Sequence, residues 1–257
     1  MNSTFLKQRC AFAHNLLDNS DFRQPINLRG ETSYNANSMA INRWKVLSGT
    51  FIVNSGYIST GFFEQKIRAE SYKGHYTLAA KRTDGNILVY SQPIENAYHH
   101  TEARPSFGAF DDGFVRVTFP AGEYVWAVLY KGIYTAKTLP SYHSKGYMAE
   151  LLACQRYYYP YKPSNTALSF AGWYYSTSAV RVALPLPVAM DISSSRVPTI
   201  SLDTANVLVL PEKKVPTSIQ VTVVSPNMIM LTFGVTGTQH DLCAIRVNAP
   251  LVIIAPD

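Results

Sequence analysis

The sequence contains little cysteine, little charge and no long apolar run, and each shortage excludes a class of protein. The 257 residues include three cysteines, Cys10, Cys154 and Cys243, which are too few and too scattered for a disulfide framework or a zinc site. We expect them to be reduced, the last two as buried packing groups. Charged residues make up only 16% of the chain, whereas tyrosine (17) and phenylalanine (12) are abundant, which excludes a disordered chain.

Membrane insertion and export are not expected either. No apolar run approaches the length of a membrane span. The opening residues, MNSTFLKQRCAFAHNLL, lack the continuous apolar core and the cleavage site of a signal peptide. We therefore expect the chain to fold in the cytoplasm of the cell that makes it.

The net charge of +6 does not point to nucleic acid, because the basic residues are spread out. Lys81-Arg82 and Lys213-Lys214 are the only adjacent basic pairs in the sequence. Proteins that follow a phosphate backbone need clustered lysine and arginine. We expect a mildly basic, solvated surface and no nucleic-acid partner.

The first thirteen residues differ from the rest and predict an N-terminal arm, residues 1–13. Ser3 can cap a short helix whose apolar positions recur three and four residues apart, including Phe5, Leu6 and Phe12. A helix this short is marginal by itself and needs a surface to lie on. We expect the arm to attach the protein to a partner.

Two strand-rich regions predict an all-β fold with two β-sandwiches. Residues 14–143 alternate in polarity between turn signals such as Asp84-Gly85, and Glu123 to Tyr130 is apolar on both faces, as an inner strand would be. These residues predict a jelly-roll domain. Eight further strand signals follow Pro163 and predict a second sandwich over residues 163–257.

A connector helix and a tyrosine-rich turn are predicted between the sandwiches, over residues 144–162. Good helix formers follow Ser144, a candidate cap, and Pro160 ends the pattern. Met148, Leu151, Leu152 and Gln155 form one stripe, which we expect to pack on both halves.

No motif supports catalysis or a cofactor. Nucleophile elbows, phosphate loops and metalloprotease patterns do not occur. His99-His100 matches no ligand framework, and Asp111-Asp112 is typical of a turn. We expect no enzymatic activity, no metal site and no cofactor.

Clustered aromatic residues are the strongest remaining signal. They flank the predicted helix and a Pro-rich turn, so we expect them to converge as a contact for another subunit first and for a glycan second. Packing alone is the other interpretation. The residues are Tyr157, Tyr158, Tyr159, Tyr161, Trp173, Tyr174 and Tyr175. Trp44 and Trp126 lie in alternating apolar patterns and are expected in the core.

Three segments resemble a known group of proteins. Asn15-Leu16-Leu17-Asp18-Asn19-Ser20-Asp21-Phe22 with Asn42-Arg43-Trp44 resembles the opening of carbohydrate-binding-module-like jelly rolls in phage structural proteins. Glu150-Leu151-Leu152-Ala153-Cys154-Gln155-Arg156-Tyr157-Tyr158 is similar to the "EL..CQRYY" segment of tail-fibre and other virion appendage proteins. Leu186 to Met190 and Val197 to Ile200 look like the "P.pMR..PT" segment that follows it there.

The resemblance implies a bacteriophage virion protein, namely a fibre, tip or decoration subunit. It implies a homo-oligomer, with a trimer favoured, attachment to other virion proteins through the arm, and contact with the host surface, where a glycan is a possible ligand. No catalytic residue carries over. Two alternatives stay open: a non-catalytic carbohydrate-binding module of a cellular glycan-degrading system, and a phage depolymerase.

Overall fold

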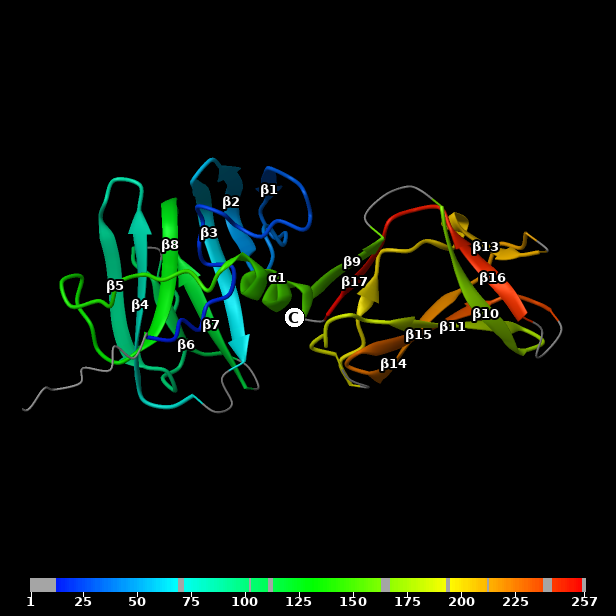
Figure 1. Ribbon diagram of the computed structural model, residues 1–257. Coiled ribbons are helices and arrows are strands. Elements are labelled where there is room, and N and C mark those ends of the chain that lie inside the picture. Colours follow the sequence, from blue (N-terminus) through cyan, green and yellow to red (C-terminus); the bar gives the residue numbers. More distant parts are fainter. Residues whose placement is uncertain are drawn as a thin grey trace, which may run out of the picture. The chain divides into compact units, whose positions relative to one another are not determined.

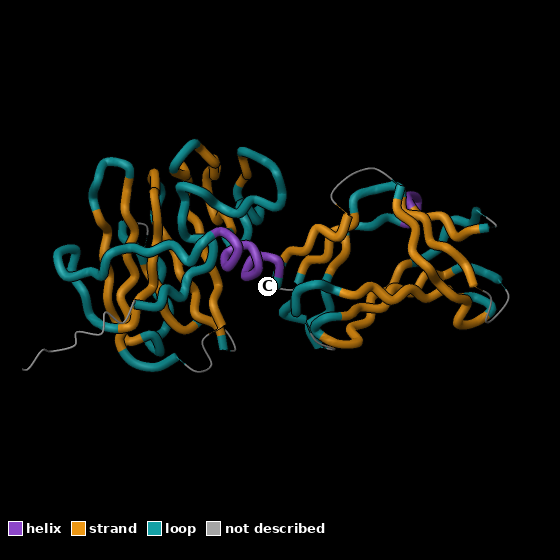
Figure 2. Tube along the Cα trace, in the orientation of Figure 1, coloured by secondary structure: helices purple, strands orange, loops and turns teal. Residues whose placement is uncertain are grey.

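The computed structural model describes residues 13–68, 72–101, 103–110, 113–162, 167–192, 195–211, 213–237 and 242–255. Phe5, Leu6 and Phe12 of the predicted arm, and Cys10, lie outside these residues. Strands account for 51% of the chain and helix for 5%, which confirms the all-β, β-sandwich type of fold (Figure 2). None of the helices in the described part of the chain has the length and apolar character needed to cross a membrane.

The chain divides into two compact units, residues 1–150 and 151–257, which are described separately. Unit 1 contains one antiparallel sheet of eight strands (Figure 1). Its strands are β1 (Ser33–Asn35), β2 (Lys45–Asn54), β3 (Tyr57–Arg68), β4 (His75–Arg82), β5 (Ile87–Pro93), β6 (Ser106–Ala109), β7 (Phe114–Phe119) and β8 (Gly122–Lys131). The predicted hairpin at Asp84-Gly85 joins β4 to β5, and Gly85 has a positive φ of 88°.

The long strand β3 allows this sheet to enclose a core. Along one side, β3 pairs with β8 through Ile58–Thr60 and then with β7 through Phe63–Arg68. Gly61 lies between these two paired segments of β3. A Cβ atom there would stand 2.0 Å from the Ser48 carbonyl oxygen, so the close approach of β2 requires glycine at this position. Side chains from all eight strands meet in one apolar core that includes Trp44, as predicted.

A second, smaller apolar cluster covers the other face of β4 and β8. Trp126, Val128 and Tyr130 of β8 are buried there, and Tyr142 stacks on Trp126 with ring centroids 5.1 Å apart. The strand β8 is therefore buried on both faces, as the apolar run from Glu123 to Tyr130 predicts.

Unit 2 contains a six-stranded and a three-stranded antiparallel sheet. The larger has the order β13 (Val207–Leu210), β16 (Leu242–Val247), β10 (Leu168–Ser176), β11 (Ala179–Pro185), β15 (Met228–Gly234), β14 (Ile219–Ser225). The smaller has the order β12 (Thr199–Ile200), β17 (Leu251–Ile254), β9 (Tyr158–Lys162). A short 3-10 helix, Thr204–Asn206, precedes β13, and the core contains residues of both sheets.

Two predictions about residues 144–162 need correction. The helix α1 (Tyr147–Gln155) forms, but the predicted apolar stripe is wrong: Met148 is 63% exposed, and Glu150 and Cys154 are buried instead. Residues Tyr158–Lys162 are the strand β9, which pairs with β17, and not a turn. In both cases the deciding partners lie far away in the sequence.

Candidate functional site

The predicted aromatic residues do not converge on one surface. Tyr157, Tyr159 and Tyr161 are half-buried and pack against the core of unit 2, and the ring of Tyr161 lies 5.7 Å from that of Phe170. Tyr158, also half-buried, is paired in register with Ile254 of β17. The strand β9 therefore uses most of its aromatic side chains to complete the core.

The second aromatic group, Trp173-Tyr174-Tyr175 on β10, is divided by the alternation of the strand. Tyr174 points into the core and is 1% exposed. Its ring lies against Gly237, where a Cβ atom would come within 2.1 Å, so this packing requires glycine. Trp173 is half-buried and Tyr175 is 49% exposed, on the opposite face of the sheet. The outward residues are free to contact something other than their own core.

Arg181, which the sequence analysis did not single out, lies beside the outward aromatics. Its guanidinium carbon is 3.4 Å from the centroid of the Tyr175 ring, a cation–π contact. Trp173 is directly paired with Arg181 on β11 and with Leu242 on β16. The Leu242 side chain is 85% exposed. The structure thus combines aromatic surface, a cation and exposed apolar surface on one face of the larger sheet.

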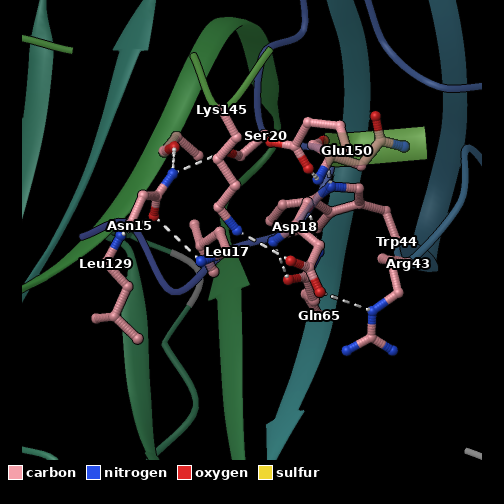
Figure 3. Close-up of polar contacts among 12 residues, drawn as sticks. Asn15, Leu17, Asp18, Ser20, Arg43, Trp44, Gln65, Leu129, Lys145 and Glu150 are labelled. Atoms are coloured by element: carbon pink, nitrogen blue, oxygen red, sulfur yellow. Dashed lines mark hydrogen bonds and ion pairs between the residues drawn. The ribbon is translucent and has the colours of Figure 1, made fainter. Parts of the chain in front are cut away.

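Unit 1 contains a buried polar network built on the first of the three resembling segments (Figure 3). Asn15 uses its whole amide: Oδ1 accepts from the N–H groups of Leu17 and Leu129, at 3.1 and 2.9 Å. Its Nδ2 donates to Ser20 Oγ at 2.8 Å and to the Ala127 carbonyl at 3.2 Å. This residue ties the N-terminal segment to β8.

Asn19 is the centre of the same network. Its Nδ2 donates to the carbonyl oxygens of Ile26 and Asn42, at 2.8 and 2.7 Å, and its Oδ1 accepts from Ile26 N at 2.6 Å. Its carbonyl accepts from Trp44 Nε1 at 2.8 Å, and its N–H donates to Glu150 Oε2 at 2.6 Å. Asn19 has a positive φ of 50°, a conformation that asparagine tolerates better than most residues.

Asp18 and Glu150 have opposite electrostatic environments within this network. Asp18 forms ion pairs with Lys145 Nζ at 3.0 Å and Arg43 Nε at 3.4 Å. Burial acts to raise the pKa of Asp18, but these two cations lower it overall below its usual 3.8. Glu150 is 4% exposed, its Oε1 has no hydrogen-bond partner in the described part of the chain, and burial raises its pKa above 4.5.

Two carboxyl groups with pKa values pushed apart can serve as acid and base, but here there is no room for a substrate. The cavity beside Glu150 has a volume of about 20 Å³ and is lined by Asn19, Asp21, Gln24, Ile26, Ser144 and Tyr147. That volume holds one water molecule. The network therefore holds the N-terminal segment and the start of α1 in place.

These two carboxyl groups give a pair of stability predictions with opposite signs. Folding raises the pKa of Glu150, so the folded state favours the protonated carboxyl group. The stability that this group contributes is present at low pH and is lost as pH rises through the folded pKa. Glu150→Gln should therefore raise the free energy of unfolding at pH 8, by about 1 kcal/mol, with the gain shrinking as pH falls toward 4.5. Denaturant titrations from pH 4 to 8 measure this difference.

Asp18→Asn is the matched comparison. The pKa of Asp18 is lowered on folding, so its contribution is present above 3.8 and lost as pH falls through the folded pKa. The variant should lose about 2 kcal/mol at neutral pH, where Lys145 and Arg43 are left without their carboxylate. Equal pH profiles for the two variants would contradict this assignment.

Metal ligation and similarity to known proteins add no further site. Among the residues that the structure describes, no three His, Cys, Asp or Glu side chains are grouped so that they could hold a metal ion. His99 and His100 are exposed, and the His100 ring lies edge-on against Phe62, 4.5 Å between centroids. Comparison of the chain with protein-family models, curated proteins and solved structures finds no match.

Proposed function

We propose that this chain is a non-catalytic structural subunit of a bacteriophage virion, a fibre, tip or decoration protein that takes part in particle assembly and host-surface attachment. The order of the three resembling segments supports this assignment. The polar residues of the first segment, Asn15, Asp18 and Asn19, are all engaged in holding unit 1 together, as expected of a structural protein. The protein would reside in the virion after synthesis in the host cytoplasm.

One structural observation supports a contact role more than any other. Trp173, Tyr175 and Leu242 lie on the outward face of the larger sheet, where they do not contribute to the core of unit 2. Exposed apolar groups clustered in this way are typical of interaction surfaces. We propose that unit 2 makes the outward contacts and that residues 1–13 attach the chain to other virion proteins. The protein would act as a homo-oligomer, with a trimer favoured.

The arm provides the direct test. A variant that begins at Ala13 keeps every described residue, including Asn15 and its contacts to β8. We expect its melting temperature to change by only a few degrees, whereas its incorporation into phage particles, measured by mass spectrometry of purified particles, should be lost. The full chain should be present in the same preparation.

Two results would count against the proposal. If the full chain is missing from purified particles, the protein is not a virion component. If the shortened variant instead loses several kcal/mol, which is the scale of one or two buried aromatic side chains, Phe5, Leu6 and Phe12 belong to a core and not to an attachment arm. A sugar-release assay separates the depolymerase alternative, since a binding subunit releases no sugar.

A further inference from the structure

Five side chains form a continuous row across the outward face of the larger sheet of unit 2. Strand register places them opposite one another on neighbouring strands, from β16 through β10, β11 and β15 to β14. Residues directly opposite each other project to the same face. At the usual strand spacing the row is roughly 19 Å long. We call it the outer row; in order, it consists of Leu242, Trp173, Arg181, Thr232 and Gln220.

The order of chemical types along the outer row is informative. An apolar side chain and an indole occupy one end, a guanidinium the middle, and a hydroxyl and an amide the other end. Tyr175 adds an exposed aromatic ring beside Arg181. Aromatic faces stack on the apolar faces of sugar rings, and hydroxyl and amide groups exchange hydrogen bonds with sugar hydroxyls. The row therefore has the chemistry of a carbohydrate platform.

Arg181 indicates which kind of carbohydrate would be bound. Its charge is placed over the Tyr175 ring, and its buried Nε has no hydrogen-bond partner among the described residues. By contrast, Arg196 in the same unit forms an ion pair with Asp191 at 3.3 Å. None of the five residues of the outer row is acidic. A guanidinium that is not paired with a described carboxylate fits the carboxylate of a ligand.

We propose that the outer row binds a carboxylate-bearing glycan, one that contains uronic or sialic acid residues. Trp173 and Tyr175 stack on the sugar rings, Arg181 binds the carboxylate, and Thr232 and Gln220 bind hydroxyl groups. This inference rests on the proposed function, because it names what a host-attachment subunit would recognise. A single cation among aromatic and neutral polar groups fits a sugar acid better than a nucleic acid, which needs several phosphate contacts.

Charge also argues against a second copy of this chain on the same surface. A symmetric face-to-face contact would bring two outer rows together, and each row carries a guanidinium while none of its five residues is acidic. Like charges placed directly opposite each other are destabilising. The carboxylate of a sugar supplies the missing negative charge.

The test uses the full chain and oligosaccharide pairs that differ only in charge. Oligogalacturonate and oligosialate are each compared with their neutral methyl esters by titration calorimetry. We expect the free acids to bind and the esters to bind at least about tenfold more weakly, because the ester removes the charge that the guanidinium contacts. Tyr175→Ala and Arg181→Gln should each weaken binding of the acids by about tenfold or more.

Matched controls come from unit 1. Lys131→Gln removes one positive charge, as Arg181→Gln does, and Tyr147→Ala removes an exposed tyrosine, 60% exposed, as Tyr175→Ala does. Both should bind the acidic oligosaccharides as the unchanged protein does. If they lose affinity equally, the binding is unspecific charge or aromatic attraction and the inference is wrong.

Three further results would overturn it. If the protein binds the acidic oligosaccharides and their esters with equal affinity, Arg181 does not recognise a carboxylate. If the unchanged protein binds no sugar and Tyr175→Ala or Arg181→Gln has a lower oligomer mass than the unchanged protein, the face is a contact between copies of the chain. If the protein binds neither oligogalacturonate nor oligosialate, the outer row is not a site for acidic glycans. Particle incorporation of the same variants is scored separately, so a failed glycan site and a failed virion assignment remain distinguishable.

Discussion

Replacing Asn19 with alanine is expected to destabilise unit 1 by roughly 4 kcal/mol, one of the largest effects we expect from a single substitution. The side chain satisfies the N–H and the carbonyl of Ile26 and the carbonyl of Asn42, all within 2.8 Å. Alanine leaves the Ile26 N–H and the Asn42 carbonyl unpaired, at about 1–3 kcal/mol each when water cannot replace the lost partner. The Ile26 carbonyl still accepts from the Asn42 N–H at 3.3 Å. Equilibrium unfolding in urea, followed by tryptophan fluorescence, measures the loss.

Asn37 supplies the control for this prediction. It has a similar positive φ, 63° against 50° for Asn19, but is exposed. Asn37→Ala therefore has the same backbone penalty without the buried hydrogen bonds, and we expect it to lose only about 1 kcal/mol. If the two variants lose the same amount, the cost at Asn19 is backbone strain, and the polar network contributes little.

Much of the fold could be predicted because strand signals are local. Alternating polarity together with turn residues predicted β4, β5, β7 and β8, and most strands of unit 2, to within a few residues. The strand β9 was missed because its sequence, Tyr-Tyr-Pro-Tyr-Lys, has no alternation in polarity and contains a proline. Its identity as a strand depends on pairing with β17, about ninety residues later.

The polar network could not be predicted for a different reason. The motif containing Asn15, Asp18 and Asn19 was visible, but its partners come from distant parts of the chain. Glu150 is 131 residues from Asn19, and Lys145 is 127 residues from Asp18. An apolar pattern cannot indicate a buried carboxyl group, so the sequence predicts a helix stripe that includes Met148 and Leu152, which are exposed.

The outer row shows the same limit in unit 2. The sequence shows that Trp173 and Tyr175 share a face of one strand, because they are two residues apart. It does not show that Arg181 lies opposite Trp173, because that depends on the register between β10 and β11. Sequence reasoning therefore found the aromatic part of the candidate site and missed its cation.

The second large effect is expected at Trp44, which is fully buried in unit 1. Its ring lies 5.1 Å from that of Phe63, 5.5 Å from Phe22 and 5.9 Å from Phe119. Trp44→Ala removes this packing and leaves a cavity, so we expect a loss of about 4 kcal/mol. Denaturant unfolding of the full chain, followed by circular dichroism, measures it without relying on the replaced fluorophore.

The more conservative variant Trp44→Phe separates packing from hydrogen bonding. Phenylalanine keeps aromatic contact with the core but cannot donate to the Asn19 carbonyl, as the indole N–H does at 2.8 Å. We expect a loss of about 2 kcal/mol, from the unpaired carbonyl and the smaller ring.

Trp126→Phe is the matched control, because it makes the same change at a second buried tryptophan of unit 1. Trp126 packs against Tyr142 with an interplanar angle of 3°, and phenylalanine preserves that stacking. We expect this variant to lose about 1 kcal/mol, from the smaller ring alone. A Trp44→Phe variant as stable as Trp126→Phe would show that the indole hydrogen bond to Asn19 contributes nothing. A larger loss for Trp44→Phe would be the contribution of the buried hydrogen bond from the indole to the Asn19 carbonyl.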